Sequence, residues 1–275
     1  LFFNVYFPLQ ILLFYYSLRF FFPAKKSNYI REYFMTDNTP YCRSAKIIFD
    51  EGALAPKPYS KTLLSIAPHG ILTLGWSYCI SSRSFFDSEV KWLVAPAMMI
   101  LPFVSDVMHW TGCHSCAPKS MREIMSTGCN VGLIPGGFQE ATMFKHGHHR
   151  LYLKSKKGFI KYALQFGYSI TPIYVFGEEL TFWTADILPT SVSLWLNKYQ
   201  IPTYFFIGRY FFMPNDDMDF NVVVGKTIEL PQINDPSSED IDKYHTIYIN
   251  KYNELFNKFK GKYASEGEKA ILEIF

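Results

Sequence analysis

Short apolar runs that end in turns alternate with helix-length segments along this chain. Such runs occupy residues 62–66, 130–134 and 169–176. Amphipathic segments at 158–166 and 241–259 have the residue spacing of helices. Strands that alternate with helices are typical of an α/β domain. We therefore predict a single α/β domain with a largely parallel central sheet flanked by helices.

The other segments are assigned by the same signals. Residues 41–58 contain two prolines and a glycine and are predicted to form a connector. Further helices are predicted at 71–80 and 118–127, and a further strand at 91–95.

The N-terminus is strongly apolar. Its first 22 residues approach the roughly 20 that span the hydrocarbon core of a bilayer. We predict that residues 1–24 form a membrane-embedded segment, either a spanning helix or a re-entrant hairpin, and that residues 25–275 form the folded domain. The alternative is a helix buried in the core. Lys25, Lys26 and Arg31 follow the segment, so the positive-inside rule places the remainder in the cytosol.

The composition limits the partners of the chain. Hydrophobic residues make up 49% and charged residues 19% of the 275, a low charged share for a freely soluble enzyme. This balance favours a folded domain that also rests on a lipid phase. A net charge of +3 is too small to favour nucleic acid, and five cysteines, an odd number, favour a reducing compartment. The chain begins with leucine rather than methionine, which is compatible with missing upstream sequence.

A histidine lies in the turn that ends the first apolar run, in the segment Ala67-Pro68-His69-Gly70. Proline fixes its own backbone φ, and glycine gives the turn freedom behind the histidine. A neutral imidazole accepts a proton at physiological pH, so His69 is our candidate general base. The alternative is a histidine that only caps a strand.

A glycine pair and a glutamate follow the second apolar run. Glu140 and His69 both follow strands that precede helices, so we expect them at the same carboxyl edge of the sheet. There the carboxylate could orient the imidazole. The N–H groups of Gly136 and Gly137 could stabilise an oxyanion. The alternatives are an ordinary strand–helix turn and an acidic residue at a helix N-terminus.

A basic stretch lies between Glu140 and Glu178, where no acidic residue occurs. Such a stretch should attract phosphate groups, either those of coenzyme A or those of anionic lipid headgroups. The alternative is a solvated helix face. The basic residues are Lys145, Arg150, Lys154, Lys156, Lys157 and Lys161.

Cysteine and histidine clusters give weaker signals. Cys113 and Cys116 form a CxxC pair without a second ligand pair, so core or loop cysteines are favoured over a zinc site, and we predict no metal. His146, His148 and His149 are assigned to a polar loop that contains a glycine, and the alternative is a metal site. No Gly-x-Ser-x-Gly motif occurs, so a nucleophile-elbow hydrolase has no support.

These motifs follow one another in an order that one family shares. Residues 67–70 stand where that family usually has His-Pro-His-Gly, and 136–140 match its Gly-Gly-x-x-Glu. Further matches lie at 156–167, 172–177 and 223–226, and at His245 with Tyr248 before Leu255 and Phe256. From about Tyr33 to its end, the chain thus resembles the diacylglycerol acyltransferase type 2 family, which includes monoacylglycerol and wax-ester acyltransferases.

The resemblance implies a glycerolipid-acyltransferase-like fold and a membrane-bound enzyme. Such an enzyme would move a fatty acyl group from acyl-CoA to diacylglycerol, forming triacylglycerol, with His69 as general base and Glu140 as its acidic partner. Acyl-CoA is then a co-substrate and no cofactor is needed. The expected substrate-binding residues are Pro68, Gly70, Gly136, Gly137, Lys154, Lys156, Lys157, Gly158 and Phe159.

The implied partners are acyl-CoA, a neutral lipid acceptor and the bilayer, without nucleic acid, and a homo-oligomer stays open. The implied location is the endoplasmic reticulum membrane with the site facing the cytosol, or a lipid droplet. Two departures from the pattern widen the choice of function. Ala67 replaces the first histidine of the motif, and Leu74 stands where related glycerol-phosphate acyltransferases have aspartate. The alternatives are a monoacylglycerol or fatty-alcohol acyltransferase and a catalytically weak lipid-binding scaffold.

Overall fold

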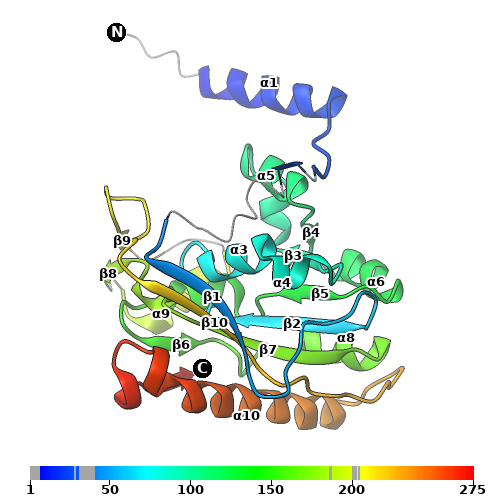
Figure 1. Ribbon diagram of the computed structural model, residues 1–275. Coiled ribbons are helices and arrows are strands. Elements are labelled where there is room, and N and C mark those ends of the chain that lie inside the picture. The colour runs from blue at the N-terminus through cyan, green and yellow to red at the C-terminus, as the bar shows by residue number, and fades with distance from the viewer. Residues whose placement is uncertain (1–6, 28, 31–40, 186–187, 200–202, 204) are drawn as a thin grey trace.

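A computed structural model describes residues 7–27, 29–30, 41–185, 188–199, 203 and 205–275 (Figure 1). The first six residues of the predicted membrane segment and Arg31 lie outside the described residues. The described chain forms a seven-stranded sheet with helices on both faces.

The sheet has the strand order β1-β10-β7-β2-β5-β3-β4. Its pairs are parallel except for β10 with β7, which is antiparallel. The prediction of a largely parallel central sheet is confirmed. The strands are β1 (Ser44–Phe49), β2 (Thr62–Ala67), β3 (Lys91–Val94), β4 (His114–Ser115), β5 (Val131–Leu133), β7 (Ser169–Phe176) and β10 (Asp219–Val224).

Alternate side chains of the central strands fill two separate cores. Leu63 of β2 packs on the face covered by α6 (Pro118–Ser126), α8 (Gly158–Phe166) and α10 (Ser238–Tyr263). Leu64, the next residue, packs on the face covered by α3 (Leu74–Ser81), α4 (Arg83–Phe86) and α5 (Val104–Trp110). This alternation follows from the two-residue period of a strand. Both faces of β2 are buried, so its sequence is a continuous apolar run rather than an alternating one.

Smaller elements surround the sheet. Two two-stranded sheets lie outside it: β6 (His149–Leu151) pairs in parallel with β11 (Leu272–Ile274), and β8 (Trp183–Ala185) pairs antiparallel with β9 (Phe205–Ile207). Helical turns complete the chain: η1 (Pro96–Met99), α7 (Gly137–Thr142), η2 (Glu178–Leu180), α9 (Thr190–Asn197) and η3 (Gly267–Lys269). The segment predicted as a connector, residues 41–58, instead contains the edge strand β1.

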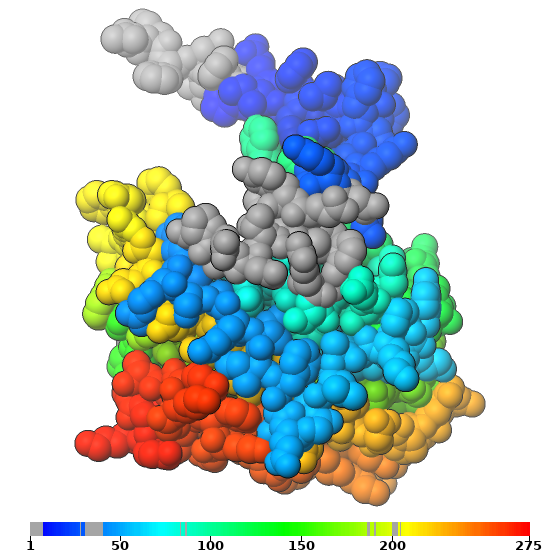
Figure 2. Space-filling model, in the orientation of Figure 1, coloured from blue at the N-terminus to red at the C-terminus, as the bar shows by residue number. Residues whose placement is uncertain are grey.

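The N-terminal helix α1 (Phe7–Phe21) stands away from the sheet and lies over α5 (Figures 1 and 2). The hydroxyl of Tyr15 donates to Asp106 at 3.0 Å, and Arg19 forms an ion pair with the same carboxylate at 2.7 Å. Several apolar side chains of α1, such as Leu13 and Phe14, are exposed. Within the described residues, no helix combines the length and the apolar character that crossing a bilayer requires. The spanning segment stays a prediction.

Candidate active site

His69 lies at the carboxyl end of β2, in the loop that leads to α3. Its side chain is half-buried, while Pro68 and Gly70 on either side are buried. The ring Nδ1 is 2.9 Å from the carbonyl oxygen of Gly70, so Nδ1 carries the proton and donates it there. Burial lowers the pKa of His69 and keeps the imidazole neutral. The lone pair on Nε2 is therefore available to accept a proton.

Glu140 meets the His69 loop through its backbone. One carboxylate oxygen accepts the main-chain N–H of His69 at 2.5 Å, and the other accepts the N–H of Tyr152 at 2.8 Å. The expectation that both residues lie at one edge of the sheet is confirmed. The expectation that Glu140 orients the imidazole is not met, because its contact is with the peptide group. Burial raises the pKa of Glu140 to about 7, although its two backbone hydrogen bonds favour the charged form.

The glycine pair beside Glu140 is required for two different reasons. A Cβ on Gly136 would lie 2.1 Å from the Oε2 atom of Glu140, so only glycine leaves room for the carboxylate. Gly137 has a φ of +57° and open space where a Cβ would point. Gly137 therefore begins the short helix α7 with a surface that a ligand can approach.

A second buried carboxylate, Glu178, holds the other end of the same loop. It follows β7, the strand next to β2, and accepts the N–H groups of Leu74 at 3.2 Å and Gly75 at 2.7 Å. A Cβ on Gly70 would lie 2.1 Å from its Oε1 atom. Burial raises the pKa of Glu178 to about 8. The loop from His69 to Gly75 is thus anchored at both ends by carboxylates.

Sequence reasoning missed Glu178. The sequence has no acidic residue between His69 and Asp87, and Glu140 was the acidic partner predicted for His69. The available signal was the pair Glu178-Glu179 directly after a buried strand and a glycine, which places carboxylates at the same sheet edge.

The three lysines predicted to bind substrate separate in the structure. Lys156 donates to the side chain of Gln139 at 2.8 Å and lies close to Glu140; burial lowers its pKa. Lys157 instead forms an ion pair with Asp242 of α10 at 2.6 Å, and Lys154 is exposed. Lys156 is therefore the lysine beside the candidate site.

Gly158 and Phe159, two of the predicted substrate-binding residues, differ in their surroundings. Gly158 is exposed at the start of α8, and nothing lies within 4 Å of the Cβ it lacks. Phe159 is buried, with its ring 5.0 Å from that of Tyr248 between α8 and α10. Phe159 is therefore a core residue, on the face of the sheet away from α3.

The cysteine and histidine clusters do not converge. Cys113 is buried and Cys116 is exposed, and His146 stacks on Trp183 while His149 is buried beside Tyr174. In the part of the chain that the structure describes, no three His, Cys, Asp or Glu side chains are placed to hold a metal ion.

Comparison with known proteins identifies the family. The profile of the family described as diacylglycerol acyltransferase matches residues 1–273 of the 275. The chain belongs to the diacylglycerol acyltransferase family. The prediction of an acyltransferase is confirmed at the level of the family.

The relatives of this chain are named as acyltransferases of different acceptors. Diacylglycerol O-acyltransferase 1 of Eremothecium gossypii is 32% identical over 74% of this chain and 48% of that protein. Diacylglycerol O-acyltransferase 2 of Dictyostelium discoideum is 29% identical over 76% of this chain and 69% of that protein. Acyl-CoA wax alcohol acyltransferase 1 of Homo sapiens is also 29% identical, over 77% and 70%. The chain thus spans between 48% and 70% of the length of these relatives.

One solved structure has a similar outline to this diacylglycerol acyltransferase family member. The 1-acyl-sn-glycerophosphate acyltransferase PlsC of Thermotoga maritima gives a TM-score of 0.46 at 15% identity, over 90% of this chain and 95% of that chain. This similarity is too low to transfer the roles of residues.

Proposed function

We propose that this protein transfers a fatty acyl group from acyl-CoA to the hydroxyl of a neutral lipid, with diacylglycerol as the first candidate and triacylglycerol as the product. The observation that carries the proposal is the neutral His69 ring, whose Nδ1 donates to Gly70 and whose Nε2 is left to accept a proton. This ring stands at the sheet edge where open α/β folds bind ligands.

The proposed reaction is a direct transfer. Nε2 of His69 removes the proton from the acceptor hydroxyl as the oxygen attacks the thioester carbonyl. The carbonyl oxygen becomes an oxyanion, and the N–H groups of Gly136 and Gly137 donate to it. The C–S bond then breaks, and the departing thiolate takes the proton from the imidazolium. Glu140 and Glu178 act on the backbone and hold the loop in place during these steps.

The acyl-CoA phosphates are assigned to the basic side of the site. Lys156 lies beside Glu140, and the exposed Lys154 extends the positive charge outward. Acyl-CoA is the co-substrate in this scheme and no separate cofactor takes part. The exposed apolar face of α1 supports docking on a membrane, and we assign this to the cytosolic face of the endoplasmic reticulum.

The deciding experiment replaces the proposed base. We expect His69→Ala to lower ester formation from labelled acyl-CoA by about 10²–10⁴-fold, because the hydroxyl loses its proton acceptor. His148→Ala is the control, because His148 is exposed in another loop, and its rate should stay unchanged. Unaltered activity in a folded His69→Ala protein would remove His69 from the mechanism.

The acceptor is open to a second candidate because the relatives include wax alcohol acyltransferases. A panel of diacylglycerol, monoacylglycerol and a long-chain alcohol, each with the same acyl-CoA, decides between them. Triacylglycerol as the main product supports the first candidate. Ester formation only with the alcohol supports the second. Binding of acyl-CoA without any ester supports the lipid-binding scaffold, the alternative to which Ala67 points.

A further inference from the structure

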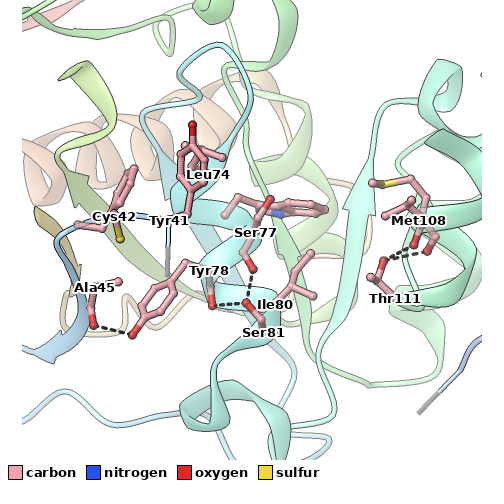
Figure 3. A pocket seen from close by; sticks show the side chains of 13 residues that line it. Tyr41, Cys42, Ala45, Leu74, Ser77, Tyr78, Ile80, Ser81, Met108 and Thr111 are labelled. Atoms are coloured by element: carbon pink, nitrogen blue, oxygen red, sulfur yellow. Dashed lines mark hydrogen bonds between the residues drawn. The ribbon is translucent and has the colours of Figure 1, made fainter. Parts of the chain in front are cut away.

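An apolar pocket of about 350 Å³ lies between α3 and α5, on the side of the sheet away from α10 (Figure 3). Leu74, Trp76 and Ile80 line it from α3, and Val107 and Met108 line it from α5. Ala45 of the edge strand β1 and Phe220 of its neighbour β10 also line it. The remaining lining residues are Tyr41, Cys42, Ser77, Tyr78, Ser81 and Thr111. Its size is at the lower end of the range for ligand sites, about 300–1,000 Å³.

The pocket offers little to a polar ligand. Among the residues that the structure describes, no charged side chain lines it. The hydroxyl of Tyr78 donates to the carbonyl of Ala45 at 2.9 Å, and that of Ser81 donates to the carbonyl of Ser77 at 2.8 Å (Figure 3). The hydroxyl of Thr111 donates to the carbonyl of Val107 at 2.8 Å. These hydroxyls already donate to the main chain and present mainly their carbon atoms. The indole N–H of Trp76 has no hydrogen-bond partner in the described part of the chain, but the rest of the lining is mostly carbon and suits a hydrocarbon.

Two of the lining residues relate the pocket to its surroundings: Leu74 belongs to the loop that begins at His69, and Val107 belongs to an exposed apolar surface. At one end lies Leu74, whose N–H is held by Glu178, the carboxylate that also lies against Gly70 of the His69 loop. At the other end, Val107 is exposed on α5, next to exposed Phe103 and Val104. A chain in the pocket would therefore reach from an apolar surface toward the imidazole.

We propose that this pocket binds one alkyl chain of a lipid substrate and limits the chain length that the protein accepts. That the bound lipid is a substrate rests on the proposed function, but the binding of an alkyl chain in this pocket does not. Two molecules carry such an alkyl chain. They are acyl-CoA, in its acyl group, and the acceptor lipid, in one of its fatty chains.

The first test narrows the pocket with Ala45→Phe and widens it with Met108→Ala. The rate is measured as kcat/KM for palmitoyl-CoA and octanoyl-CoA at a fixed acceptor, and for dioleoylglycerol and dioctanoylglycerol at a fixed acyl-CoA. Ala45→Phe should lower the long-to-short ratio by about fourfold for each methylene shut out, and Met108→Ala should raise it. The series in which the ratio moves identifies the source of the chain.

Lys46→Phe is the matched control, because Lys46 neighbours Ala45 on β1 and its ammonium group lies over Tyr263 on the opposite face. Its chain-length ratios should equal those of the wild type. If both series leave the ratios unchanged in folded Ala45→Phe and Met108→Ala proteins, the pocket does not bind the chain.

The second test does not depend on turnover. Palmitate that carries a photoreactive diazirine near its methyl end is bound to the wild-type protein, irradiated and mapped by mass spectrometry. Labelling within 74–81 and 104–111 supports the proposal, even in a preparation that forms no ester. Labelling confined to segments that do not line the pocket overturns it, even in a preparation that does form ester.

Discussion

At the scale of single residues, buried carboxylates determine where glycine is needed. The missing side chains of Gly70 and Gly136 leave the space that Glu178 and Glu140 occupy. The sequence allowed Gly136 and Glu140 to be paired because they are four residues apart and follow one strand. It did not link Gly70 with Glu178, because these residues meet only through the parallel pairing of β2 with β7.

A series of alanine substitutions separates the two costs at these glycines. Gly70→Ala forces a side chain into a backbone with φ of +62° and against Glu178, so we expect it to lower the free energy of unfolding by about 2–4 kcal/mol. Gly137→Ala shares the positive φ but meets no atom within 4 Å, and should cost about 1–2 kcal/mol. Gly158→Ala, with open space, should stay within about 0.5 kcal/mol of the wild type. Urea unfolding measures all three, and equal losses for Gly70→Ala and Gly137→Ala would show that Glu178 exerts no steric effect.

At the scale of elements, the buried strands and amphipathic helices were predictable from the sequence, and the edge strand β1 was not. The helix predicted at 158–166 is α8, and the strand predicted at 169–176 is β7. Strand β1 was assigned to a connector because its residues are only partly buried and give a weak pattern. Its partner β10 begins at Asp219, far along the chain, so no local signal announces the pairing.

The attachment of α1 depends on one carboxylate. Asp106 is buried and receives both Tyr15 and Arg19, so Asp106→Asn should weaken the docking of α1 by removing the charge that Arg19 pairs with. We expect faster amide hydrogen exchange in Phe7–Phe21, with unchanged protection in β2 and β7. Asp217→Asn is the control, because its ion pair with Arg43 is exposed. Unchanged exchange in α1 would mean that apolar contacts hold it without the ion pair.

At the scale of the whole molecule, the α/β class was predictable because the alternation of apolar runs and helices extends through most of the chain. The charge state of the interior was not. Three buried glutamates have raised pKa values: Glu140 and Glu179 at about 7 and Glu178 at about 8, each chiefly through burial. No sequence pattern shows that these carboxyls lose their water.

This interior makes stability depend on pH. A carboxyl with a raised pKa holds its proton in the folded state after the unfolded chain has released it, so stability falls as pH rises through that interval. We expect the free energy of unfolding to fall between pH 6.5 and 8, by up to about 1.4 kcal/mol per pH unit for each carboxyl. Below pH 6.5, the lowered pKa of His149, about 4 through burial, acts in the opposite direction.

Denaturant titrations at several pH values measure this slope. Glu179→Gln should make the decline shallower, because glutamine carries no titrating proton. Glu123→Gln, on the exposed surface of α6, should leave it unchanged. A wild-type stability that rises from pH 6.5 to 8 would contradict the burial of these carboxyls.

The two carboxylate anchors of the His69 loop also determine how the protein can bind its substrates. A segment tied at its start to α7 and at its end to η2, which follows β7, cannot move without releasing main-chain hydrogen bonds on both sides. Under the proposed mechanism, the imidazole of His69 is therefore held in place, and the lipid hydroxyl and the thioester have to reach it. Access of the two substrates, rather than movement of His69, would then limit the start of each cycle.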